Sequence, residues 1–253
     1  MPLLTHKETR ERNREKALLV LRFLRTSIYS TAELLGEVMG VKSRNGIFET
    51  LQGMERKQLL RHQSFQEFTG TFTLWGITPA GQQACLQDGE EPVAVFFNTS
   101  KVSLANLQHY LSLQQIRIRA EAHGWTAFTY CDRRPVNKIK TAQDEDTINE
   151  KIRPDMLALT PQNRKVAIES ERTLKWPPRY KEHVIPGHIR RVNADEYDQV
   201  IWVCRTKNDE ERLRTILAAA LKELKDDKEL HLERGSKDYK TFNVTSIGSW
   251  PKY

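Results

Sequence analysis

Three carboxylates stand on two neighbouring apolar segments in the middle of the chain. Asp155 lies at the start of the first segment, residues 153–159, and Glu169 and Glu171 end the second, residues 165–171. Side chains alternate between the two faces of a β-strand, so the two glutamates would point the same way, roughly 7 Å apart along the strand. Two like charges on one face of a core strand repel each other and lose hydration, which costs free energy.

A divalent cation would remove that conflict, because hard cations such as Mg²⁺ take oxygen ligands from one or two carboxylates and keep several waters. If the turn between the segments folds them into a hairpin, Asp155 lies beside the two glutamates. The three could then hold a metal ion and its water next to a phosphodiester, with Lys175 and Arg172 offsetting charge on the phosphate. The alternative is that the glutamates lie on the solvent face of an edge strand and pair with Arg172 or Arg153.

The composition favours an anionic partner. The 253 residues carry a formal net charge of +7, which makes nucleic acid the first candidate and a membrane surface the second. The three cysteines are far apart and form no Cys-x-x-Cys pair, which argues against a disulfide framework or structural zinc and fits a reducing cytosol. The first residues are too charged for a signal peptide, and no apolar run reaches the roughly 18 residues of a membrane span. We therefore expect a cytoplasmic protein without membrane insertion.

Three helices and a ribbon of two strands are predicted for the first part of the chain. Apolar residues recur at helical spacing in residues 11–26, and Ser30, with Glu33 completing a capping box, and Ser43 are placed to begin two more helices. A ribbon ending in TFTLWGIT and a short helix over residues 78–86 follow. This order resembles a winged helix-turn-helix, whose commonest ligand is DNA, although many such domains contact only proteins. The candidate DNA-contacting residues are those at the start of the third helix: Lys42, Ser43, Arg44 and Asn45.

The polar stretch LQDGEEP marks a domain boundary, so we expect a winged helix in residues 1–88 and a second domain in residues 93–253. The second domain is predicted to contain a long helix ended by Gly124, five strands and two later helices in the order α, β, β, β, α, β, α, β, which implies a mixed α/β sheet flanked by helices. A long basic loop separates its first strand from the acidic hairpin. The loop is either solvated and mobile or grips DNA through residues that include Arg133 and Arg134, and Arg179 further along could line the path of the strand.

The acidic segments resemble the PD-(D/E)xK nuclease superfamily, which has a restriction-endonuclease-like fold. Pro154-Asp155 matches the PD element, and Glu169-Ser170-Glu171 stands where (D/E)-x-K is expected. The position of the usual lysine is therefore occupied by Glu171. Either Lys175 reaches back into the site, or the role of the lysine is absent.

The combination of a winged helix, RPDMLAL and IESERTLKWPPRY resembles the MobC-type relaxases of mobilizable plasmids, over residues 15–205. That resemblance implies a nickase that cuts one DNA strand at a plasmid transfer origin with Mg²⁺ or Mn²⁺. It also implies partnership with accessory mobilization proteins and a coupling protein in a bacterial cytoplasm. In its terms Asp155, Glu169 and Glu171 are metal ligands and Lys175 is an auxiliary catalytic group. No two of the seven histidines form a His-x-His pair, which disfavours the histidine-based relaxase mechanism, and Tyr180 is better explained by packing or phosphate contact than as a nucleophile.

Two other functions remain open. The missing lysine at position 171 is compatible with a plasmid replication initiator or regulator that binds DNA without cutting it. A restriction-type endonuclease would share the metal chemistry but cut both strands.

Overall fold

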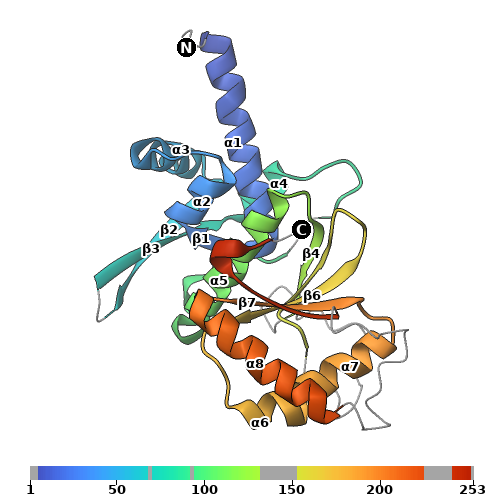
Figure 1. The fold of residues 1–253 in the computed structure, drawn as a ribbon. Coiled ribbons are helices and arrows are strands. Elements are labelled where there is room, and N and C mark those ends of the chain that lie inside the picture. The colour runs from blue at the N-terminus through green and yellow to red at the C-terminus, as the bar shows by residue number, and fades with distance from the viewer. Residues whose placement is uncertain (1–4, 68–69, 92–93, 132–152, 225–240, 252–253) are drawn as a thin grey trace. The chain divides into compact units, whose positions relative to one another are not determined.

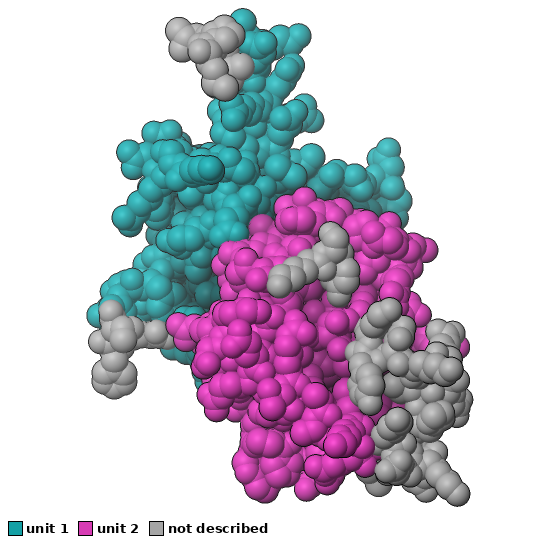
Figure 2. Space-filling model, in the orientation of Figure 1, with its two compact units in different colours: residues 1–114 teal, residues 115–253 magenta. Residues whose placement is uncertain are grey.

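The computed structural model describes residues 5–67, 70–91, 94–131, 153–224 and 241–251. The protein has a mixed α/β structure, in which N-terminal helices with a small antiparallel sheet precede a five-stranded mixed sheet flanked by helices (Figure 1). The chain forms two compact units, residues 1–114 and 115–253, coloured separately in Figure 2. No helix in the described part of the chain is both long and apolar enough to cross a membrane.

The described part of the first unit contains helices α1 to α4, the start of α5 and a three-stranded antiparallel sheet with the order β1-β3-β2. Its helices pack on one another through leucines that are fully buried, among them Leu24, Leu35 and Leu51. The predicted hairpin is confirmed, because Leu60 pairs with Ile77 and the ladder continues to the tip. The elements are α1 (His6–Ser27), β1 (Tyr29–Thr31), α2 (Ala32–Val38), α3 (Arg44–Arg56), β2 (Leu60–Glu67), β3 (Gly70–Ile77), α4 (Pro79–Ala84) and the 3₁₀ turn η1 (Thr99–Lys101).

One predicted helix start is wrong. Ser30 does not cap α2, because it belongs to the short strand β1, where it pairs with Trp75, and its hydroxyl donates to the side-chain oxygen of Gln114 at 2.5 Å. Thr31 is the N-cap instead, and its hydroxyl accepts a hydrogen bond from the Leu34 amide. The predicted cap of α3 is confirmed, since the Ser43 hydroxyl accepts from the Gly46 amide.

The second unit contains five strands in the order β4-β5-β6-β7-β8. The pairs β4–β5 and β5–β6 are antiparallel, whereas β6–β7 and β7–β8 are parallel. A parallel pair needs a crossover connection, and helices occupy both connections, as the sequence pattern predicts. The strands are β4 (Thr126–Tyr130), β5 (Met156–Leu159), β6 (Lys165–Glu171), β7 (Gln199–Cys204) and β8 (Phe242–Ser246).

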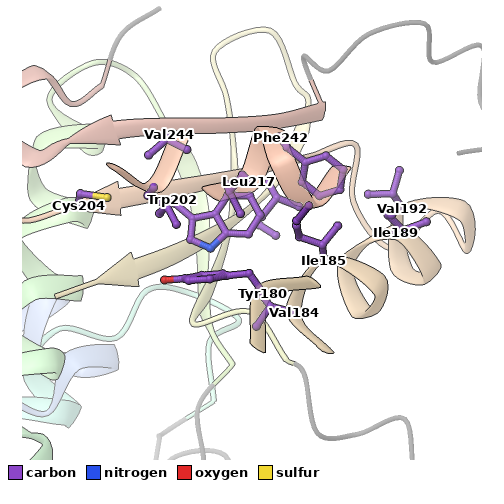
Figure 3. Packing of buried hydrophobic residues seen from close by; sticks show 14 of the residues in the cluster. Tyr180, Val184, Ile185, Ile189, Val192, Trp202, Cys204, Leu217, Phe242 and Val244 are labelled. Carbon is purple, nitrogen blue, oxygen red and sulfur yellow. The ribbon is translucent and has the colours of Figure 1, made fainter. Parts of the chain in front are cut away.

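A hydrophobic core covers one face of this sheet. Figure 3 shows Trp202 of β7 between Tyr180 and Val244, with Leu217 close by. The predicted helix over residues 177–190 is divided into a short α6, a π-helical turn and α7, and the π-helical turn and α7 contribute residues to this core. The helices of the unit are α5 (Leu104–Glu121), which begins in the first unit, α6 (Pro177–Arg179), the π-helical turn η4 (Tyr180–Val184), α7 (Ile185–Asn193), α8 (Lys207–Leu224) and the 3₁₀ turn η7 (Ile247–Ser249).

Candidate functional site

The strand register brings Asp155 beside the glutamate-bearing end of β6. Met156 pairs with Ile168, so the same register continued by one residue sets Asp155 opposite Glu169. A hydrogen bond of 2.7 Å from the Ser170 amide to Oδ2 of Asp155 holds the carboxylate against β6. Residues opposite one another in an antiparallel pair share a face of the sheet. Asp155 and the two glutamates therefore face the same side.

That side is the face covered by α7 and α8. Glu169 and Glu171 are paired with Trp202 and Cys204 of β7, and Trp202 belongs to the buried core on this face. Strand β6 lies between β5 and β7, so it is an interior strand. The alternative of two glutamates on the solvent face of an edge strand is therefore wrong.

Lys175 reaches back to Glu171 from the segment that follows β6. Its ammonium group lies 2.7 Å from Oε1 and 2.5 Å from Oε2 of Glu171, whose side chain is only 3% exposed. The Lys175 amide donates to the hydroxyl of Tyr180 at 3.1 Å, which fixes the turn. Of the two alternatives for the absent motif lysine, this geometry matches the first, because an ammonium group stands beside position 171. A cation at Glu171 would have to displace this ammonium or share the carboxylate with it.

Glu169 faces His188, a histidine of α7 that the sequence analysis did not single out. Nε2 of His188 lies 3.3 Å from Oε1 of Glu169 without hydrogen-bond geometry, and among the described residues Nε2 has no hydrogen-bond partner. Nδ1 shares a hydrogen bond of 2.7 Å with the hydroxyl of Tyr197. Burial, and then the charge of Arg191, lowers the pKa of His188 to about 3, against the opposing effect of Asp155. The imidazole is therefore neutral near pH 7 and forms no ion pair with the carboxylate.

The sequence carries a signal for this histidine. His188 stands three residues after Ile185 and four before Val192, on the apolar stripe of α7, and that spacing predicts burial. Its partner Tyr197 lies beyond the end of the helix, so the contact depends on the tertiary fold.

The donor chemistry near Asp155 and Glu169 fits a hard divalent cation only in part. Within the described residues, no three His, Cys, Asp or Glu side chains are placed to hold a metal ion together. Magnesium is nevertheless commonly held by one or two carboxylates with waters. Asp155 and Glu169 are thus suitable oxygen donors for Mg²⁺ or Mn²⁺, whereas Glu171 is engaged with Lys175.

Tyr180 is a packing residue in this geometry. It is fully buried in the core beside the acidic face, and burial followed by the charge of Glu171 raises the pKa of its hydroxyl. A phenol that is shielded and harder to ionise is a poor nucleophile.

Five of the residues predicted to contact DNA lie in the described part of the chain, and all five are exposed. Those at the start of α3 are exposed, and the guanidinium of Arg44 lies 5.7 Å from the ring centre of Phe48. Arg179 at the end of α6 is also exposed. Arg133 and Arg134 lie outside the described residues.

No protein-family model matches the chain, and a search of curated proteins finds no match to it.

Proposed function

We propose that the chain is a metal-dependent DNA nickase of the relaxase type, which cuts one strand at a plasmid transfer origin. The observation that carries the proposal is the gathering of Asp155 and Glu169 on one face of the sheet, next to an ammonium group held at position 171. Carboxylates that can hold a metal ion, beside a cation that can meet a phosphate, are what phosphodiester cleavage requires.

The architecture of the two units supports DNA binding by the first part of the chain and strand cleavage by the second. Three helices followed by an antiparallel hairpin are compatible with a winged helix-turn-helix in residues 1–88, which would grip duplex DNA through Lys42, Ser43, Arg44 and Asn45. The mixed sheet with its acidic strand is compatible with a PD-(D/E)xK core in residues 93–253. Accessory mobilization proteins and a coupling protein belong to the same proposal.

Each residue of the acidic face has a role in the proposed reaction. Asp155 and Glu169 would hold Mg²⁺ or Mn²⁺, which supplies a more acidic water and neutralises charge on the phosphodiester. Lys175 would donate to the phosphate oxygens as negative charge develops on them. Glu171 is a positioning residue, because it holds the Lys175 ammonium at this end of β6.

The test is nicking of a supercoiled plasmid that carries the cognate transfer origin, in the presence of Mn²⁺. We expect Glu169→Gln to lower the rate of relaxation at least 100-fold, because one of the two carboxylates proposed to hold the ion loses its charge. The control is Glu223→Gln, an exposed carboxylate of α8 paired with Lys181, which should nick like the wild type. Relaxation by Glu169→Gln at the wild-type rate would refute the proposal, and a linear product in place of a nicked circle would indicate a restriction-type endonuclease.

A DNA-binding protein without cleavage activity is the second candidate. It is favoured by the two contacts that engage both oxygens of Glu171 with Lys175. This candidate predicts sequence-specific DNA binding with no calorimetric heat on titration with Mn²⁺. Heat that disappears in Asp155→Asn would count against it and in favour of the nickase.

A further inference from the structure

One tryptophan of the second unit stands in solvent, close to the candidate site. Trp176 is 74% exposed, whereas Trp75, Trp125, Trp202 and Trp250 are all at least 95% buried. Burying a large aromatic side chain contributes a few kcal/mol to folding, so an indole left in water forgoes that contribution. The packing of the described chain gives no reason for an indole at this position.

The backbone around Trp176 is constrained. Pro177 and Pro178 follow it directly and form the first turn of α6, and a proline fixes its own φ and restricts the residue before it. The carbonyl oxygen of Trp176 accepts a hydrogen bond of 3.0 Å from the Arg179 amide. The indole is therefore presented to solvent from a fixed turn.

Basic residues lie near Trp176 along the chain. It follows Lys175, the residue whose ammonium group meets Glu171, and the exposed Arg179 lies three residues further on. Among the described residues of the second unit, Trp176 is the only large hydrophobic side chain that is exposed. Surfaces that dock proteins are usually contiguous apolar patches of several hundred Å², so a single indole flanked by cations fits a different class of ligand.

We propose that Trp176 stacks on an unpaired nucleobase of the DNA strand next to the cleavage position. Proteins that hold unpaired strands combine aromatic faces with cationic side chains, because every base offers a flat face and every linkage a negative charge. The position of this base relative to the cut rests on the proposed nickase activity. The stacking itself rests only on the exposed indole and its basic neighbours.

Fluorescence tests the stacking directly, because the other four tryptophans are shielded from solvent. In the absence of divalent cations, a 12-nucleotide oligo(dT) should quench the emission of Trp176 and protect it from acrylamide. A blunt duplex of the same length, which has no unpaired base, should leave it accessible. Stacking is worth about 1–3 kcal/mol per base, so Trp176→Ala should weaken oligo(dT) binding by about 5- to 150-fold in fluorescence anisotropy.

Two variants serve as controls. Trp176→Phe keeps an aromatic face and should bind oligo(dT) within about fivefold of the wild type, and Phe96→Ala, which removes an exposed aromatic ring of the first unit, should bind normally. Far-ultraviolet circular dichroism checks that each variant is folded.

Unchanged oligo(dT) affinity in Trp176→Ala, or an indole still open to acrylamide at saturating oligo(dT), would overturn the inference and leave Trp176 to a protein partner. The measurement uses no cleavage step. A chain that stacks oligo(dT) but never nicks contradicts the proposed function alone, and a chain that nicks without stacking contradicts this inference alone.

Discussion

At the scale of single residues, His188 shows how burial sets the charge of a side chain. The imidazole is fully buried between Tyr197 and Glu169, and its neutral form is the one that the folded protein holds near pH 7. A neutral histidine forms no ion pair with the carboxylate beside it. The proposed metal site requires the oxygens of this carboxylate as ligands of the cation.

The buried imidazole predicts a loss of stability in acid. Its folded pKa of about 3 lies below the ordinary value of 6.5, so between these two pH values the unfolded chain binds a proton that the folded chain does not. The free energy of unfolding is therefore unaffected by titration of this imidazole above pH 6.5, and it falls by up to about 1.4 kcal/mol per pH unit as the pH drops below that value. His188→Gln should therefore flatten the dependence of the free energy of unfolding on pH between 6 and 4, as measured by urea denaturation.

The slope is the informative quantity, because glutamine in the same site also changes the stability at every pH. His183→Gln is the matched control, since His183 lies on the preceding turn and is exposed. A pH dependence that is the same in His188→Gln and the wild type would show that the folded and unfolded chains protonate this imidazole equally, against the lowered pKa.

At the scale of elements, local patterns predicted most helices and strands, whereas contacts between distant segments were not predictable. Alternation within β6 was enough to place Glu169 and Glu171 on one face, and the turn after β5 was enough to predict the hairpin. Strand β1 was missed because it has three residues and exists only through its pairing with β3. The return of Lys175 to Glu171 depends on the path after β6, which the contact with buried Tyr180 determines.

The glycine in the short helix α4 is predicted to be important for stability, because its surroundings leave no room for a side chain. A Cβ atom added to Gly81 would lie 2.2 Å from the carbonyl oxygen of Leu59, which already accepts a hydrogen bond from the Thr78 amide. Because a backbone oxygen cannot move away as a side-chain tip can, Gly81→Ala should lower the free energy of unfolding by about 1–3 kcal/mol in urea denaturation.

Gly53 in α3 provides the matched comparison. A Cβ atom at this helical glycine would have Arg56 Nη2, at 3.8 Å, as its nearest neighbour. Gly53→Ala should raise the stability by about 0.5–1 kcal/mol, because alanine has the higher helix propensity. Equal effects of the two substitutions would mean that α4 does not approach Leu59 as described.

At the scale of the whole molecule, the sequence predicted two parts of different class, and the structure contains helices with a small sheet followed by a mixed sheet. The compact units divide at residue 114, inside α5, where the helical pattern of the sequence continues without a break. Chain composition cannot reveal a division of this kind, because it arises from the packing around the helix. The placement of His188 against Glu169 is likewise a product of the tertiary fold.

Because the chain carries a net charge of +7, we expect its affinity for DNA to fall as the salt concentration rises. If Lys42 at the start of α3 contacts a phosphate, Lys42→Ala should reduce the magnitude of the slope of log K against log salt by about one on duplex DNA. Lys101→Ala removes another exposed lysine of the same unit, outside the proposed interface, and should leave the slope unchanged. Identical slopes for wild type and Lys42→Ala, measured by anisotropy between 50 and 200 mM salt, would place the interface elsewhere.

The ion pair at the end of β6 also limits how descendants of this sequence can diverge. A lysine placed at position 171 alone would set two ammonium groups against each other, and losing Lys175 alone would leave the buried carboxylate of Glu171 without this cation. Exchanging both residues together keeps one ammonium group and one carboxylate in the site. The two codons are therefore expected to change together, so that a lineage keeps its lysine at one position or the other.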